Sequence, residues 1–269
     1  MVPFDLSLLR ERHNITFEAA EDNQETAAFA LDTEEQIELL LNRFGEGLNT
    51  SDKRVIGSLF VKRYSTLIAG ALYLWTHRLI GLEMSLKRVR ISMKGIGLSF
   101  HIPDQAQFEP LYAASEMQRK NDLYIGHLLS DNVSPLFSIT AQTTGIRETN
   151  LWSHFSYLLA YWRKEWIREA ETCELGSRVE NVYRVMTEQF NPYWFPGQTV
   201  NPIVSRFRNV ADPLHEGQSI MLRDKCCLNY RLPGEDRYCY TCPLITDEKR
   251  LDKYMAVHAK EHIPVLGKL

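Results

Sequence analysis

The chain has 269 residues, of which 44% are hydrophobic and 24% are charged. That length is enough for a full hydrophobic core in one large domain or two small ones, and the composition excludes an intrinsically disordered chain. The formal net charge of −3 argues against a nucleic-acid partner, because such partners are bound largely through positively charged contacts to phosphate.

The N-terminal segment lacks the features of an export signal, since acidic residues come early and no continuous apolar core follows. The most apolar run, residues 66–74, is well short of the roughly 20 residues that span a bilayer. We therefore predict a buried helix there, no membrane-spanning segment and a cytoplasmic location. In that compartment clustered cysteines more often hold metal or do redox chemistry than form structural disulfides.

The first half of the chain is predicted to be mostly helical. Residues 33–44 carry apolar side chains at helical spacing, with Thr33 as the expected N-cap and Gly45 as the expected stop. A second, more buried helix is predicted over residues 65–84.

The hydrophobic period then changes from helical to alternating. In residues 88–94 charged or polar side chains alternate with apolar ones, which is the pattern of a half-buried strand. Gly95 and Gly97 are expected turn residues, and residues 98–102 continue as the partner strand. The sequence predicts a small antiparallel hairpin among helices.

From residue 134 onward the sequence again predicts helices. Ser134 is the expected N-cap of the first, and Gly145 its expected end. The remaining helices are expected over residues 150–174, over residues 179–190 after a break at Gly176, and over residues 247–261. The predicted fold class is α+β, mainly helical, with a small antiparallel sheet and a C-terminal cysteine-ligated cluster loop.

Four of the five cysteines lie in one short loop, as two pairs separated by eleven residues: Cys226, Cys227, Cys239 and Cys242. The second pair has Cys-x-x-Cys spacing, which lets two thiolates reach one metal while backbone N–H groups point at the sulfurs. The first pair is adjacent, whereas zinc ribbons and fingers use a spaced pair at both ends. An adjacent pair suits a site with more than one metal atom, and four thiolates are the usual complement of a [2Fe–2S] cluster.

The spacing alone leaves other interpretations open. Zinc also accepts four thiolates, so one alternative is a structural zinc site in a binding or scaffold protein. A redox dithiol at Cys239 and Cys242 is less favoured, because it leaves the adjacent pair unexplained. An iron–sulfur electron carrier or sensor that serves a protein partner would use the same four cysteines.

The segment 223–244, RDKCCLNYRLPGEDRYCYTCPL, resembles the C-terminal signature of the FhuF family of ferric-siderophore reductases. That signature is a basic residue, Cys-Cys-Leu, a Tyr-Arg segment and Cys-x-x-Cys-Pro. The matching positions are Arg223, Cys226, Cys227, Leu228, Tyr230, Arg231, Cys239, Cys242 and Pro243. Residues 135–152 are more loosely similar to the family's upstream domain. The spacer between the pairs is one residue longer than in the family, within a turn-forming stretch (PGEDR) where insertions cost little.

The resemblance implies that the four cysteines ligate one [2Fe–2S] cluster, which is the redox centre of an oxidoreductase. It implies a substrate that is a ferric siderophore, whose Fe(III) gains one electron and leaves as Fe(II). Siderophores bind through hard oxygen donors, which favour Fe(III) over Fe(II), so reduction weakens the chelate. The electron must come from an external protein or small reductant, because no glycine-rich nucleotide motif follows a strand.

Iron-bound siderophores are frequently neutral or anionic, so basic residues near the cluster would assist binding. The candidate substrate-binding residues are Arg223, Lys225, Arg231 and Arg237. We expect residues 1–215 to form a mainly helical substrate-binding or scaffold region, and residues 216–269 to form the iron–sulfur cluster lobe with its terminal helix. The two are expected to pack as one compact unit.

Overall fold

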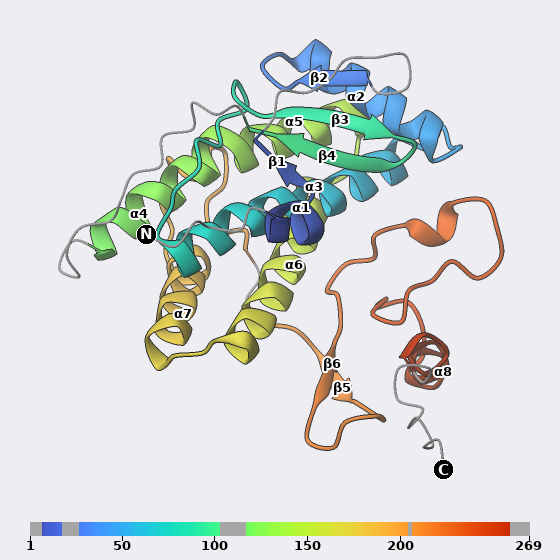
Figure 1. The fold of residues 1–269 in the computed structure, drawn as a ribbon. Helices are drawn as coiled ribbons and strands as arrows, with labels where there is room; N and C mark the ends of the chain where they lie inside the picture. The colour runs from blue at the N-terminus through green and yellow to red at the C-terminus, as the bar shows by residue number, and fades with distance from the viewer. Residues whose placement is uncertain (1–6, 18–26, 103–116, 204–205, 259–269) are drawn as a thin grey trace.

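The computed structural model describes residues 7–17, 27–102, 117–203 and 206–258. Helices and a small sheet form a body over residues 7–203 (Figure 1). Short strands, a long loop and one helix form a second part over residues 206–258, called here the cysteine lobe. The fold is α+β and mainly helical, as the sequence predicts. The division of the chain at residue 215 stays a prediction.

One long helix, α3 (Lys53–Arg78), runs through the middle of the body. The Asp52 carboxylate caps it by accepting hydrogen bonds from two backbone N–H groups of the first turn, at 3.1 and 3.4 Å. Leu79, in the left-handed conformation with φ 59°, ends it. The predicted range of residues 65–84 is wrong at both ends, because the Asp52 cap starts the helix earlier and Leu79 stops it earlier.

The side chains of α3 are buried on every face of its central part. Among the described residues it is the one helix that is long and apolar enough to cross a membrane, but 83% of its most apolar window lies inside the protein. A helix that is apolar all round and covered by other elements is a core helix. The apolar run at residues 66–74 is therefore buried, as predicted.

The other helices of the body are α1 (Ser7–His13), α2 (Glu34–Gly47), α4 (Met117–Leu128), α5 (Ser134–Thr144), α6 (Glu148–Glu169) and α7 (Cys173–Glu188). All except α4 contact α3 broadly. Thr33 caps α2 as predicted, since its hydroxyl accepts from the backbone N–H of Gln36 at 3.3 Å. The body is therefore organised around one buried helix.

Two glycines that were expected to stop helices lie inside them. Gly45 is within α2, where a side chain would meet Ile56 at 2.4 Å, so close packing between α2 and α3 is the reason for glycine. Gly176 is within α7, which begins three residues earlier because Thr172 caps it. At Gly45 the sequence predicts a stop because a glycine that allows close packing looks the same as one that ends a helix. At Gly176 a side chain would meet nothing within 4 Å, so the structure gives no packing reason for glycine there.

The start of α5 also differs from the prediction. A π-helical turn, η2 (Leu129–Val133), joins α4 to α5 without a break, so Ser134 is not an N-cap. Its hydroxyl instead donates to the Trp194 carbonyl at 2.6 Å. Gly145 ends α5 as predicted, with φ 67°.

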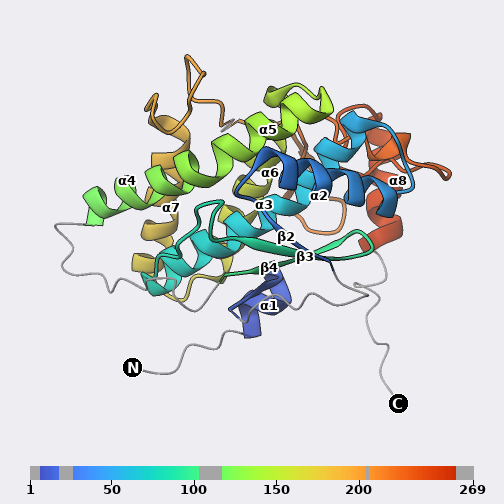
Figure 2. The same cartoon turned by 90° about the horizontal axis from the view of Figure 1, so that it is seen from above.

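Four strands form a mixed sheet, in the order β1 (Ile15–Thr16), β4 (Gly97–His101), β3 (Arg90–Lys94) and β2 (Ala27–Ala30). Strands β3 and β4 are the predicted hairpin, with Gly95 at φ 59° in the turn. Strand β1 adds a parallel pair to β4 that the sequence does not predict. Phe100 of β4 packs edge-on against Tyr64 of α3, so the sheet covers one side of α3 while α5 covers the other (Figure 2).

The cysteine lobe has a small core of its own. Strands β5 (Asn209–Ala211) and β6 (Ser219–Met221) form a hairpin, and α8 (Asp247–His258) ends the described chain. The buried side chains between them are Ile220, Leu222 and Tyr254. This core is far smaller than that of the body.

The cysteine loop (residues 226–242) lies between β6 and α8 and contains one 3-10 turn, η3 (Asn229–Arg231). Cys227 and Leu232 are buried in the core of the body rather than in that of the lobe. The lobe also touches α6, because the Tyr157 hydroxyl donates to the Met221 carbonyl at 3.3 Å. The loop therefore lies where the lobe meets the body.

Candidate metal centre

The cysteine loop folds back so that its two ends meet. The Cys226 and Cys242 sulfurs are 3.5 Å apart, and the Cys227 and Cys239 thiols hydrogen-bond to each other. Cys227 and Cys242 are almost fully buried, at 2% and 1% exposure. All four cysteines are free thiols. Each end of the loop thus contributes one sulfur to each of two pairs.

This arrangement fits a two-metal group. Two thiolates bound tetrahedrally to one metal at about 2.3 Å lie roughly 3.8 Å apart, close to the separation between Cys226 and Cys242. Within the described ranges, no three His, Cys, Asp or Glu side chains are grouped as they would be around a single ion. Two sulfur pairs are the ligand set of a [2Fe–2S] cluster, with one pair to each iron.

Donors point at three of the sulfurs, but none of the donors described for them is a backbone N–H between Cys239 and Cys242, where the sequence predicts them. The backbone N–H of Leu228, whose φ of 62° turns the chain after the adjacent pair, donates to Cys226 at 3.4 Å. The Thr241 hydroxyl donates to Cys239 at 3.6 Å, and the Leu244 N–H is directed at Cys242. Such donors stabilise thiolate charge and raise the reduction potential of a cluster.

The thiols differ in how readily they ionise. The hydrogen bond from Cys227 lowers the pKa of Cys239 to about 5, assisted by the charge of Arg223 and opposed by burial. The same hydrogen bond, together with burial, raises the pKa of Cys227. Burial raises the pKa of Cys242 to about 12. Ligation requires thiolates, so cations beside the loop are needed to make that charge tolerable.

Three cations lie beside the sulfurs. Lys62 and Arg63 project from α3, and Arg223 precedes the loop. Burial is the main cause that lowers the pKa of Lys62, with Arg223 second. Arg223 lies over the ring of Tyr157, 4.4 Å from its centroid, and donates to Thr241.

None of these three cations forms an ion pair with a carboxylate in the described part of the chain. Buried or half-buried cations without a carboxylate are costly unless an anion faces them. Four thiolates, or an anionic cluster bound by them, would supply that negative charge.

A buried polar chain connects the body to the first cysteine pair. The Ser58 hydroxyl of α3 donates to the Cys227 carbonyl at 2.9 Å and lies 2.8 Å from Nε2 of His154 on α6. Burial lowers the pKa of His154 to about 3, so the ring is neutral at neutral pH. Because the single Ser58 proton goes to the carbonyl, the proton shared with His154 comes from Nε2. Helices α3 and α6 together fix the backbone of Cys227.

The two arms of the cysteine loop are also fastened to each other. The rings of Tyr230 and Tyr238 stack with centroids 4.7 Å apart and planes within 5°. The Asn229 amide donates to the Arg237 carbonyl at 2.9 Å. The loop tip beyond these contacts is exposed, and Lys253 pairs with Asp236 there at 3.0 Å.

The four predicted substrate-binding residues have different surroundings. Only Arg223 reaches the sulfurs, through Thr241. Lys225 pairs with the neighbouring Asp224 at 3.5 Å, and Arg231 pairs with Asp52, the cap of α3, at 2.9 Å. Arg237 is on the exposed tip, with its guanidinium against Gly234. A substrate role for these residues stays a prediction.

Sequence patterns alone did not point to Ser58, Lys62, Arg63 or His154. A weak signal existed, because Ser58 and Lys62 are four residues apart and therefore share one face of an otherwise apolar helix. No local sequence pattern connects Ser58 or Lys62 with the cysteines, which come more than 160 residues later in the chain. Their contact with the loop depends on tertiary packing.

Two family models match the chain. The model for the ferric iron reductase FhuF-like transporter matches residues 58–213, and the model for the FhuF 2Fe-2S C-terminal domain matches residues 225–244. The chain belongs to the FhuF-like ferric iron reductase family. The first match includes Lys62 and His154, and the second includes all four cysteines of the loop. The cofactor is a [2Fe–2S] cluster, as the sequence predicts, which counts against a structural zinc site.

Among solved structures, a similar one is the aerobactin synthetase IucC from a hypervirulent pathotype of Klebsiella pneumoniae. The alignment covers 68% of this chain and 36% of that chain, at 10% identity and a TM-score of 0.45. This chain thus spans well under half of that protein, and a similarity this low supports no conclusion about function. A comparison with curated proteins finds no significant match.

Proposed function

We propose that this protein is a cytoplasmic ferric-siderophore reductase, which passes one electron to Fe(III) so that Fe(II) is released. The observation that carries the proposal is the meeting of four cysteine sulfurs in two pairs beside three cations that lack carboxylate partners among the described residues. In a FhuF-like chain, that arrangement supports an anionic redox centre at the seam between body and lobe.

Cys226, Cys227, Cys239 and Cys242 hold the cluster in this proposal. The two sulfur contacts favour a cluster in which Cys226 and Cys242 would hold one iron, and Cys227 and Cys239 the other. When bound, the group supplies one-electron redox chemistry. Thr241 and the backbone of Leu228 stabilise the thiolates, and the Ser58–His154 chain fixes the adjacent pair.

The cations have two roles in the proposal. Lys62, Arg63 and Arg223 offset the negative charge of the thiolates, and they also attract an anionic ferric chelate to the site. Lys225 and Arg237 are proposed as further substrate contacts from the exposed side of the loop. Arg231 is proposed too, although its ion pair with Asp52 leaves it less available.

The balance of the reaction is one electron. Fe(III) in the siderophore gains it, and Fe(II), a poorer match for hard oxygen donors, is lost to cellular acceptors. The protein need not break a covalent bond. The electron is supplied by an external donor, either a protein or a small reductant.

The test is the visible spectrum of the protein purified without oxygen, with a ferrous chelator present. Dithionite should bleach the charge-transfer bands, and a ferric hydroxamate or catecholate siderophore should restore them while trapped Fe(II) appears. Cys173→Ser, which changes an exposed free thiol on α7, should behave like wild type, whereas Cys239→Ser should not. Bands that never return with ferric chelates would indicate an electron carrier or sensor, and a colourless zinc protein would contradict the proposal.

A further inference from the structure

The first turn of α8 contains a completely buried arginine. Helix α8 begins five residues after the last cysteine, where the Thr246 hydroxyl accepts from the backbone N–H of Lys249 at 3.3 Å. Arg250 has 0% exposure, although its side chain carries a guanidinium with five N–H donors and no acceptor. A buried charge of this kind needs a full set of acceptors.

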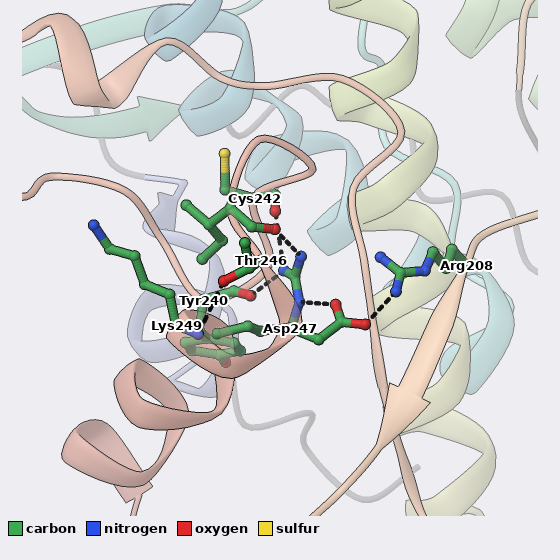
Figure 3. Close-up of polar contacts among 8 residues, drawn as sticks. Arg208, Tyr240, Cys242, Thr246, Asp247 and Lys249 are labelled. Atoms are coloured by element: carbon green, nitrogen blue, oxygen red, sulfur yellow. Dashed lines mark hydrogen bonds and ion pairs between the residues drawn. The ribbon is translucent and has the colours of Figure 1, made fainter.

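The acceptors are backbone carbonyls of the Cys-x-x-Cys turn. Nη1 of Arg250 donates to the Tyr240 carbonyl and, at 2.9 Å, to the Cys242 carbonyl. Nη2 donates to the Ile245 carbonyl at 3.1 Å. Figure 3 shows the carbonyl groups of Tyr240 and Cys242 turned toward a guanidinium beside Asp247, while the sulfur of Cys242 points away from it.

The geometry of a metal-binding turn explains why these carbonyls need a donor. In this turn the Cys242 N–H bonds to the Cys239 carbonyl at 3.0 Å, and the Leu244 N–H is directed at the Cys242 sulfur. When N–H groups face the sulfurs, the neighbouring carbonyls face the opposite way. Buried carbonyls must be satisfied, and arginine presents several donors in one rigid plane.

The charges around Arg250 do not cancel. Its Nε lies 3.2 Å from one oxygen of Asp247, while the other oxygen of that carboxylate pairs with Arg208 (Figure 3). One carboxylate is thus shared by two guanidinium groups, which leaves a net positive charge behind the last cysteine. A fixed positive charge favours the reduced, more negative state of a nearby redox group.

We propose that Arg250 is a positioning residue for the cluster. Its guanidinium holds the Cys239–Cys242 turn in its ligating shape, and its charge raises the reduction potential. Arg250 lies outside the segment that the family model matches, residues 225–244. The inference rests on the proposed ligation by the four cysteines, but it does not depend on the siderophore substrate.

The experiment compares Arg250→Met, Arg250→Lys and wild type as cluster-containing proteins. Lys249→Met is the matched control, since it removes a cation from the same helix turn, where the side chain is 47% exposed and pairs with Asp236. The readouts are the EPR spectrum of the dithionite-reduced protein, the midpoint potential and the rate of iron loss to a chelator. None of these needs a siderophore.

We expect R250M to have a tenfold lower ratio of reduced to oxidised cluster at a fixed solution potential, equal to a midpoint potential lower by about 59 mV for one electron. It should also shift the EPR spectrum and lose iron about tenfold faster, whereas K249M stays close to wild type. R250K should restore the potential, because it keeps the charge. It should not restore the EPR spectrum or iron retention, because one ammonium cannot reach all the carbonyls.

Three results would overturn the inference. The first is R250M matching K249M in all readouts. The second is loss of helical fold in cluster-free R250M, measured by far-UV circular dichroism, since the arginine would then be a general folding residue. The third applies if R250M folds but takes up no cluster, so that R250K becomes the test. A wild-type EPR spectrum and wild-type iron retention in R250K would show that the planar guanidinium is not needed. Altered values in R250K would support the inference. A wild type that holds its cluster but reduces no ferric chelate would remove only the proposed function.

Discussion

The body and the cysteine lobe are stabilised by different physical means. The body buries most of α3 among aliphatic and aromatic side chains, and burial of that extent stabilises a fold without help from metal. The lobe has a small core and is held mainly by polar ties such as Arg250 to the cysteine turn and Arg231 to Asp52. The comparison indicates that the body is a preformed support, whereas the lobe needs the cluster to complete it.

The strongest test of this comparison is a cavity in the body. Phe137 is fully buried and packs edge-on against Trp152 and Phe155. Phe137→Ala should lower the free energy of unfolding by about 3–5 kcal/mol, measured by urea denaturation of the cluster-containing protein. Leu39→Ala, at a position that is 54% exposed, is the control and should change little. The EPR spectrum of the folded F137A protein should be unchanged, and a shifted spectrum would mean that body and lobe are not separable.

Removal of the cluster should act on the other part of the molecule. After chelation under reducing conditions, amide hydrogen exchange in the cysteine loop should speed up by about a hundredfold, equal to roughly 2.7 kcal/mol of opening free energy. Exchange in α3 and α6 should stay slow. Equal loss of protection in α3 would show that the body also depends on the cluster, which would break the comparison.

Acid should weaken the body through a buried histidine. Burial lowers the pKa of His13 to about 4, below the value of about 6.5 in an unfolded chain. The unfolded state therefore binds a proton first as the pH falls from 6.5 to 4, and stability falls by about 1.4 kcal/mol per pH unit for this group. Below pH 4 both states are protonated and this loss is complete.

The measurement is the free energy of unfolding in urea across that pH range, followed by tryptophan fluorescence. The ring centroids of His13 and Trp162 are 4.8 Å apart. His13→Leu should reduce the slope of the unfolding free energy against pH by the amount that one proton contributes. His127→Gln, at an exposed histidine of α4, should leave it as in wild type. An unchanged slope in H13L would contradict the assignment.

The smallest effect is expected at an ion pair between the two parts. Arg231 and Asp52 are partly exposed, and such pairs contribute about 1 kcal/mol or less. Arg231→Met should raise hydrogen exchange in η3 by at most about fivefold, and the effect should shrink in high salt. Arg43→Met, which removes a pair within α2, should not affect η3. A larger effect would mean that this contact, rather than the cluster, holds the lobe.

Local patterns in the sequence predicted the structure correctly where that structure depends on residues that are neighbours in the chain. The alternation around β3, the Thr33 cap and the left-handed Gly145 were predicted correctly for that reason. The start of α3 was missed although Asp52 is a good cap. Strand β1 has only two residues and pairs in parallel with a distant strand, so no local pattern marks it.

The candidate site divides in the same way. The grouping of the four cysteines was predictable because their spacing is local, and the family resemblance lies in the same segment; their ligation of the cluster stays a prediction. Lys62, His154 and Arg250 were not found, because their roles depend on which surface the loop packs against. A buried charge near a cluster is set by tertiary structure, and spacing alone does not reveal it.

The stack of Tyr230 on Tyr238 has a consequence for the length of the loop. The stack joins the two arms of the cysteine loop at a point between the cysteine pairs and the exposed tip, residues 233–237. The distance between the two cysteine pairs therefore depends on the stack and not on the number of residues in the tip. From the sequence, we expect the one-residue difference from the family spacing within residues 233–237, which form that tip. We therefore expect a change in the length of the tip to leave the separation of the two cysteine pairs unchanged, because the two tyrosines hold the arms of the loop together.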